Sequence, residues 1–213
     1  MGKRGRKPKV EVPLPKVEEQ PVEEVKISKA RKKRLAKVVE PKLIKLDLGC
    51  GTRRRGEGFL GVDRVKTDAV DVVWDLETYP WPWEDNSVDD VICMHFLEHV
   101  KDLMPFMNEL HRVMKVGSKA EIVVPYYTSV RAWQDPTHVR PFAEHSFLYY
   151  NKKWRAENGL NHYPLTCDFD FSYGYILTNE WANREEQARN FAIAHYMNVV
   201  TDLQVFLVKR APE

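Results

Sequence analysis

The chain has 213 residues, of which 43% are hydrophobic, 11% aromatic and 30% charged, a composition typical of a soluble globular domain. The sequence has no apolar run near the ~18 residues of a membrane span, and its basic N-terminus lacks the apolar core of a signal peptide. Three scattered cysteines, Cys50, Cys93 and Cys167, predict reduced thiols and no disulfide or zinc site. We therefore expect a cytoplasmic protein with no membrane contact.

The charge is distributed unevenly along the chain. Residues 1–45 carry 15 basic and 6 acidic residues, whereas the remainder carries 18 basic and 25 acidic ones, so the net charges are +9 and −7. Repeated prolines and the absence of any apolar period predict a disordered basic tail over residues 1–40, followed by one domain over residues 41–213.

Two basic clusters, residues 3–9 and 31–34, make the tail a candidate for nucleic-acid binding. The first cluster is similar to an AT-hook, which places arginines in the minor groove of DNA. It departs from that pattern because Lys7 separates Arg6 from Pro8. Two interpretations remain open, a solvated extension and a nucleic-acid tether.

Short apolar runs and two helical patterns follow in the domain. Asp102 stands where the first helix needs an N-cap, and Gly117 stands just beyond its end. The alternation predicts an α/β fold, a doubly wound, mostly parallel seven-stranded sheet with helices on both faces. Only about ten residues separate the first two strands, so the first crossover helix is expected to be lost or shortened. The strands are expected over residues 43–48, 59–63, 70–75, 88–94, 121–124, 167–177 and 199–209, and the helices over residues 103–114 and 179–195.

The first predicted strand ends in a glycine turn, Asp47-Leu48-Gly49-Cys50-Gly51. Glycines let the backbone approach a ligand closely, and exposed N–H groups at such a turn can hold an anion. Asp63 ends the next strand, where a carboxylate can accept both hydroxyls of a ribose, and Asp75 ends the third. The pattern predicts a nucleoside-cofactor crevice at the carboxyl edge of the sheet.

The glycine pattern argues against a dinucleotide cofactor. The third glycine of G-x-G-x-x-G is absent, and Asp63 follows Gly51 by 12 residues, whereas that motif places its acid about 20 residues on. A nicotinamide-dependent oxidoreductase is therefore disfavoured.

The ordered motifs resemble those of class I S-adenosylmethionine-dependent methyltransferases, in particular the methyltransferase type 11 domain family. The resemblance covers about residues 43–150, and Ser118 replaces the second glycine of that family's turn. It implies a Rossmann-like methyltransferase fold with S-adenosylmethionine as cofactor. The motifs that carry the resemblance are residues 46–52, 61–63, 75–77, 80–89, 95–99 and 109–117.

The same resemblance implies a set of cofactor-binding residues. At the methionine end it implies Asp47, Gly49 and Gly51, together with Cys50 in the same turn. It further implies Asp63 on the ribose, Asp75 and Leu76 at the adenine, and Met94 and His95 beside the sulfonium. The short first crossover leaves open what covers the methionine end. Arg53, Arg54 and Arg55 are candidates for that role, and a solvated loop is the alternative.

Methyl transfer is an in-line displacement that depends mostly on positioning, with a base where the acceptor carries a proton. His95 and His138 are the catalytic candidates, because they follow the fourth and fifth strands at the carboxyl edge. Either histidine can instead hold a loop by hydrogen bonding. We expect no metal, since no C-x-x-C pair is present, although His95 and His99 do stand four residues apart.

We expect a small-molecule or glycan acceptor, with Tyr126, Tyr127 and Trp133 near its pocket. Neither the Asp/Asn-Pro-Pro-Tyr/Phe motif nor the Pro-Cys pair of the DNA methyltransferases is present. The alternative is a nucleic-acid-associated protein with a methyltransferase fold, tethered by its basic tail, that either modifies nucleic acid or has no catalytic activity.

Overall fold

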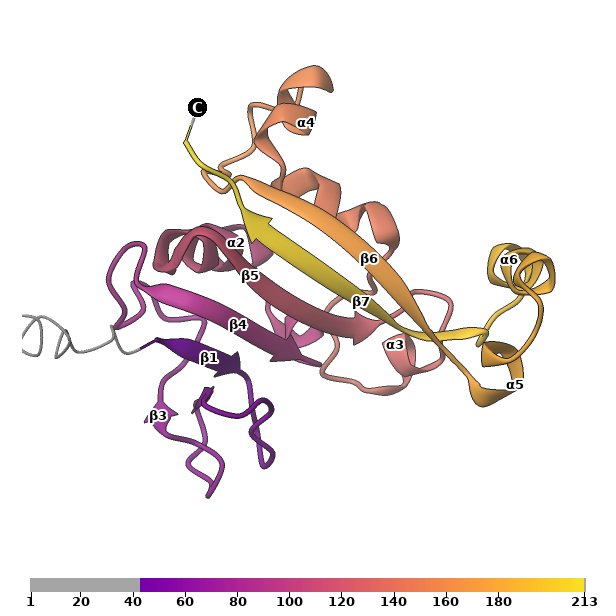
Figure 1. Ribbon diagram of the computed structural model, residues 1–213, viewed down its shortest axis with the longest axis horizontal. Coiled ribbons are helices and arrows are strands. Elements are labelled where there is room, and N and C mark those ends of the chain that lie inside the picture. Colours follow the sequence, from indigo (N-terminus) through magenta and orange to yellow (C-terminus); the bar gives the residue numbers. More distant parts are fainter. Residues whose placement is uncertain (1–42, 213) are drawn as a thin grey trace, which may run out of the picture. The chain divides into compact units, whose positions relative to one another are not determined.

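A computed structural model describes residues 43–212 of the chain. Seven strands form one sheet in the order β3-β2-β1-β4-β5-β7-β6 (Figure 1). The first five strands pair in parallel, and β7 runs antiparallel to both β5 and β6. The predicted α/β, mostly parallel seven-stranded sheet is confirmed. The strands are β1 (Lys45–Leu48), β2 (Leu60–Asp63), β3 (Val72–Val73), β4 (Val88–Met94), β5 (Met114–Pro125), β6 (Phe169–Leu177) and β7 (Val200–Lys209).

Helices and 3₁₀ turns occupy the connections after β4 and β5 and the link between β6 and β7. They are η1 (Leu97–His99), α2 (Leu103–Val113), α3 (Arg131–Gln134), η2 (Glu144–Tyr150), α4 (Lys152–Glu157), α5 (Asn179–Ala182) and α6 (Glu186–His195). Helix α2 begins as predicted, because the Asp102 carboxylate accepts a hydrogen bond from the Met104 N–H at 3.0 Å. No helix within residues 43–212 has the length and apolarity to cross a membrane.

Several element bounds differ from the prediction. The single helix expected over residues 179–195 is two helices, since α5 buries no residue and α6 buries only Ala192, too little to hold one long helix against the core. Strand β3 has two residues, because Asp71, expected within it, turns its carboxylate to the Gly61 N–H at 2.8 Å. Strand β5 begins directly after α2, and Gly117 lies inside it at φ +79°.

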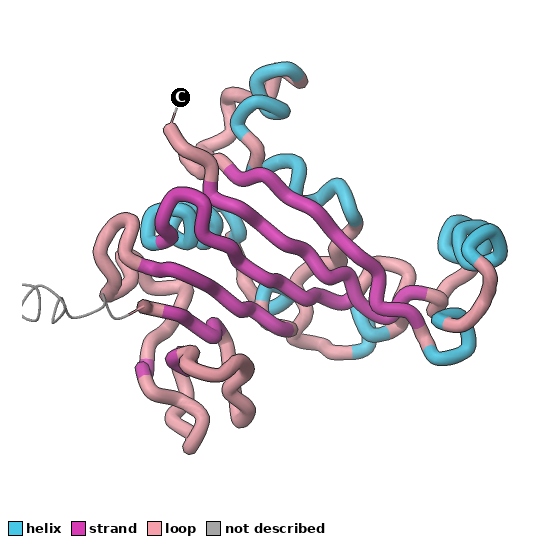
Figure 2. The backbone as a smooth tube through the Cα atoms, viewed as in Figure 1, coloured by secondary structure: helices cyan, strands magenta, loops and turns pink. Residues whose placement is uncertain are grey.

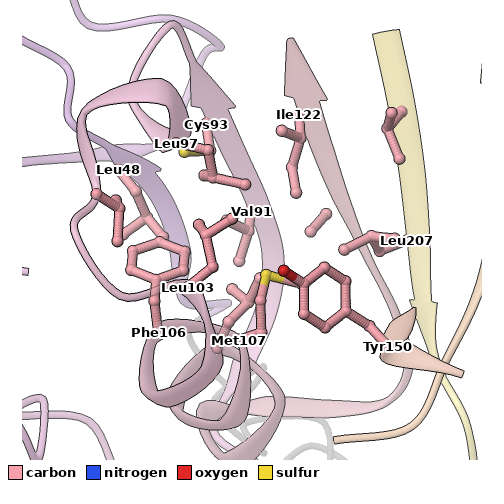
Figure 3. Packing of buried hydrophobic residues seen from close by; sticks show 14 of the residues in the cluster. Leu48, Val91, Cys93, Leu97, Leu103, Phe106, Met107, Ile122, Tyr150 and Leu207 are labelled. Atoms are coloured by element: carbon pink, nitrogen blue, oxygen red, sulfur yellow. The ribbon is translucent and has the colours of Figure 1, made fainter. Parts of the chain in front are cut away.

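The core lies between one face of the sheet and helix α2 (Figure 3). Phe106 and Met107 of α2 are fully buried, and Tyr150 of η2 packs beside them. Alternate residues of the strands, among them Val91 and Ile122, supply the other side of this core.

The opposite face of the central strands carries no helix from residues 43–212 (Figures 1 and 2). Leu203, Val205 and Leu207 of β7 are fully buried, whereas the residues between them are only partly buried. The expected helices on both faces are absent here because β1, β2, β3 and β4 are joined by loops alone. The 11-residue link between β1 and β2 has no helix, as its length predicted.

The end of β7 is joined to the end of α2 by one buried cation. Lys209 Nζ donates hydrogen bonds to the carbonyl oxygens of His111 and Met114, at 2.6 and 2.8 Å, and to Asn86 Oδ1 at 2.8 Å. The last carbonyls of a helix lack partners within the helix, and they attract positive charge. Lys209 therefore caps α2 and fixes it against the sheet, and burial lowers the pKa of its ammonium group.

We expect Lys209→Met to lower the free energy of unfolding by about 2 kcal/mol, since three oxygens, that of Met114 buried, would lose a charged donor. Urea denaturation measures this change. Lys153→Met is the matched control, because the Lys153 side chain is 68% exposed and its contact with Glu157 is 4.0 Å. Equal stability of the two variants would contradict the capping role.

Candidate functional site

A cavity of about 700 Å³ opens at the carboxyl edge of the parallel strands. Its volume falls in the range of small-molecule and cofactor sites. Six of the nine residues predicted to bind a cofactor line this crevice: Gly49, Gly51, Asp63, Asp75, Leu76 and His95. The parallel sheet therefore brings together residues from the ends of β1, β2 and β4 and from the loop after β3.

The glycine turn is shaped by contact with Phe96. Gly49 has φ +68°, and a Cβ built there would lie 2.3 Å from the Phe96 ring, so the position has room only for glycine. The Gly49 and Cys50 N–H groups donate to the Val62 carbonyl at 2.9 and 3.2 Å, and the Gly51 N–H donates to Asp63. The expected anion site on these N–H groups is therefore not available, because β2 already uses all three donors.

Asp63 is held at the centre of the crevice by two backbone donors. Its Oδ2 accepts the Gly51 N–H at 3.0 Å, and its Oδ1 accepts the Val65 N–H at 3.0 Å. Each carboxylate oxygen can still accept further bonds. The Trp74 N–H donates to the Asp63 carbonyl at 3.0 Å and so joins the loops after β2 and β3. Asp75 lies in the second of these loops, two residues beyond β3.

Asp47, Cys50 and Met94 are not among the residues that line the crevice. Asp47 is fully buried, and its Oδ2 accepts the Arg55 N–H at 2.5 Å. Burial raises the pKa of this carboxyl. Cys50 is also buried, with its sulfur 3.7 Å from the Ala69 carbonyl, and burial raises the pKa of its thiol to about 11. In the structure, Asp47 and Cys50 hold the short crossover in place.

Several lining residues were not among the predicted ones. Trp74 and Val65 add apolar surface, and Arg64 and Lys101 add positive charge. Trp74 was expected inside a strand. In the structure it follows the end of β3, in the loop that borders the crevice. The three candidate arginines 53–55 do not line the crevice, and Arg54 forms an ion pair with Asp71 instead.

A second cavity of about 210 Å³ adjoins the crevice and shares His95 and His99 with it. His95 has φ +55°, a left-handed conformation that is uncommon outside glycine. Its Nδ1 lies 3.5 Å from Glu98 Oε1 and 4.0 Å from Asp202 Oδ1. His138 lines only the second cavity, where its Nε2 lies 4.0 Å from Glu98 Oε1. Both catalytic candidates therefore face one buried carboxylate.

The aromatic residues proposed near the acceptor lie together, away from the crevice: the Tyr126 and Tyr127 ring centroids are 4.7 Å apart, and Trp133 Nε1 donates to the Tyr127 carbonyl at 3.0 Å. Tyr126 is buried and donates to Glu144 Oε1 at 2.6 Å, as Tyr175 also does at 2.5 Å. Burial alone would raise the pKa of Glu144, but these two hydroxyl donors outweigh it and lower the pKa. Trp133 is 61% exposed, and Tyr127 is exposed as well. These residues border a third cavity or the surface, and none lines the crevice.

Comparisons with known proteins bear directly on this site. A family model described as a methyltransferase domain matches residues 46–122, which contain the glycine turn, Asp63, Asp75 and His95. Together with the fold, this match supports a class I S-adenosylmethionine-dependent methyltransferase. S-adenosylmethionine is the cofactor of this class. The family, the fold and the cofactor predicted from the motifs are thus confirmed.

Two solved structures are similar to this chain, and the one with the higher TM-score, from Archaeoglobus fulgidus, shows the same fold. A SAM-dependent methyltransferase from Archaeoglobus fulgidus is 20% identical, with a TM-score of 0.51 over 84% of this chain and 92% of that chain. An S-adenosylmethionine-dependent methyltransferase from Mesorhizobium loti is 14% identical, with a TM-score of 0.49 over 84% of this chain and 98% of that chain. Comparison with curated protein sequences finds no match.

We expect Gly49→Ala to cost the methyltransferase domain about 3 kcal/mol of unfolding free energy. An alanine is strained in the left-handed conformation that Gly49 adopts, and its methyl group would also overlap the Phe96 ring. Gly58→Ala is the control, because Gly58 has φ +79° but nothing lies within 4 Å of its Cβ position, so only about 1 kcal/mol should be lost. Chemical denaturation that gave equal losses would show that the Phe96 contact does not restrict the turn.

Proposed function

We propose that this methyltransferase binds S-adenosylmethionine in the crevice and methylates a small-molecule or glycan acceptor held at the adjoining cavity. The observation that carries the proposal is the shared wall of the two cavities, formed by His95 and His99. One cavity has the size and the carboxylates that suit a nucleoside, and the other is small and polar. In this proposal the two reactants lie on either side of one pair of side chains.

The residues of the crevice fit the cofactor. Asp63 has two fixed oxygens that can accept the ribose hydroxyls. Trp74, Val65 and Leu76 supply apolar surface for the adenine, and Asp75 can accept a bond from its amino group. The methionine end then lies toward His95, where β4 ends.

When bound, S-adenosylmethionine would supply a methyl carbon to a lone pair of the acceptor, in line with the carbon–sulfur bond; that bond would break, and S-adenosylhomocysteine would leave. His95 accepts the proton that the acceptor loses, since its ring borders both cavities. Glu98 and Asp202 lie within 4.0 Å of its Nδ1 and orient the ring. His138 lies deeper, with 10% of its side chain exposed, and acts on the acceptor side alone.

The second cavity supports an acceptor of modest size. Its volume of about 210 Å³ accommodates a few polar groups, and charged and polar side chains line most of it. The basic clusters 3–9 and 31–34 of the tail, on which the nucleic-acid alternative rests, lie outside the described residues. The choice between a small acceptor and nucleic acid therefore depends on which kind of molecule receives the methyl group.

We expect S-adenosylmethionine and S-adenosylhomocysteine to stabilise the chain, and NAD to leave it unchanged. A ligand at ~100 times its dissociation constant adds about 2.7 kcal/mol, a rise of a few degrees in Tm. Asp63→Asn should remove most of that rise, because it removes the charge that meets the ribose. Asp68→Asn is the control, since Asp68 is exposed on the same loop and does not line the crevice. An unchanged rise in Asp63→Asn would disprove the placement of the ribose.

We expect methyl label from S-adenosylmethionine to enter the small-molecule or glycan fraction of a cell extract. His95→Asn, which tolerates the left-handed backbone, should slow this transfer by about 10²–10⁴ while the Tm rise with S-adenosylhomocysteine persists. The exposed His145 gives the control variant His145→Asn, which should transfer label at the normal rate. Label in nucleic acid instead would support the alternative function.

A further inference from the structure

Glu98 is the least compensated charge of the site. Its side chain is 2% exposed, and neither of its carboxylate oxygens has a hydrogen-bond partner among the described residues. Burial of a carboxylate without partners is costly, and such groups are rare in folded proteins. Glu98 lines the second cavity together with His99 and His138. The nearby ring nitrogens, His95 Nδ1 at 3.5 Å and His138 Nε2 at 4.0 Å from Oε1, do not hydrogen-bond to this carboxylate, so its charge is left without a bonded donor.

The hydrogen bonds of the two histidines fix which ring nitrogens carry protons. The Thr137 hydroxyl donates its single proton to Asp135 Oδ1 at 2.6 Å, so its oxygen accepts from His99 Nδ1 at 2.9 Å. His138 Nδ1 lies 3.3 Å from the Ala132 carbonyl, which can only accept. Each Nδ1 is thus a donor, and in the neutral imidazole each Nε2 has a lone pair to offer.

The two imidazoles lie close to the Glu98 carboxylate. One ligand atom from each of Glu98, His99 and His138 lies within 4.8 Å of the others. His138 Nε2 and Glu98 Oε1 are 4.0 Å apart, and both are acceptors when the imidazole is neutral. Acceptors that face one another repel unless a cation lies between them. Two imidazoles and one carboxylate form a ligand set of divalent transition metals.

We propose that Glu98, His99 and His138 bind a divalent transition-metal ion beside the cofactor crevice, contrary to the expectation from the sequence. The outer hydrogen bonds support this assignment, because metal-bound histidines donate their other N–H to a carbonyl or to a polar side chain. His138 does so to Ala132, and His99 does so to Thr137, which is itself fixed by Asp135.

The metal site also defines the class of acceptor, a step that rests on the proposed function. Three protein ligands leave coordination positions open on a catalytic ion. His99 borders both cavities, so those positions lie near the acceptor end of the crevice. An acceptor with two neighbouring oxygens, such as a vicinal diol of a sugar or a catechol, can occupy them. The ion would orient that acceptor and favour loss of its proton.

Titration of the full chain with Co²⁺ tests the site without an acceptor. Visible absorption bands should appear and saturate at one ion per chain. Glu98→Gln and His138→Ala should each weaken Co²⁺ binding by at least about tenfold, and Thr137→Ala should weaken it by about 10- to 100-fold. His162→Ala is the control, since His162 is exposed and lines none of the cavities described here. Bands of equal strength in Glu98→Gln would overturn the assignment.

The metal-free protein gives a second readout. Glu98→Gln should raise its Tm, because the variant removes an uncompensated buried charge. A lower Tm, together with no Co²⁺ bands in the normal protein, would show that a protonated His138 pairs with Glu98 and that no metal binds. Stabilisation by S-adenosylhomocysteine is measured in parallel. If that stabilisation persists without Co²⁺ binding, only the metal proposal fails. Co²⁺ binding without stabilisation by the nucleoside would count against the proposed function instead.

Discussion

The position of β1 between β2 and β4 is the constraint on which the site depends. Leu48, the last residue of β1, aligns with Val62 on one side and with Cys93 on the other. Because all three strands run in parallel, the residues that follow them leave the sheet at one edge. The glycine turn, Asp63 and His95 are neighbours for this reason. The bonds from Gly49 and Cys50 to the Val62 carbonyl then fold the turn onto β2.

The antiparallel strand β7 completes the same edge from the other direction. Pro125 near the end of β5 pairs with Asp202 near the start of β7. Asp202 thus reaches the site from a segment more than a hundred residues beyond β4. Its Oδ2 accepts a bond from Arg131 at 2.6 Å, while its Oδ1 faces His95. The second cavity is therefore built where parallel and antiparallel strands meet, next to the crevice that parallel strands alone create.

The sequence could predict those features that depend on neighbouring residues. The glycine turn, Asp63 at the end of its strand and the Asp102 cap all follow from local patterns, and all lie where expected. The pairing of His99 with Thr137 could not be predicted, because 38 residues separate them. The same holds for Asp47, whose motif suggested ligand contact, although the short crossover uses its carboxylate to hold the Arg55 N–H.

Two buried carboxylates at this edge show how structural and functional charges differ. Asp47 and Glu98 are both almost fully buried. One oxygen of Asp47 accepts the Arg55 N–H. This bond fixes the loop between β1 and β2, which contains no helix. Glu98 accepts no bond from any described residue and faces a cavity lined by histidines. Departures from polar pairing of this kind are expected at functional sites, and this is the reason for proposing that a group from outside the chain binds at Glu98.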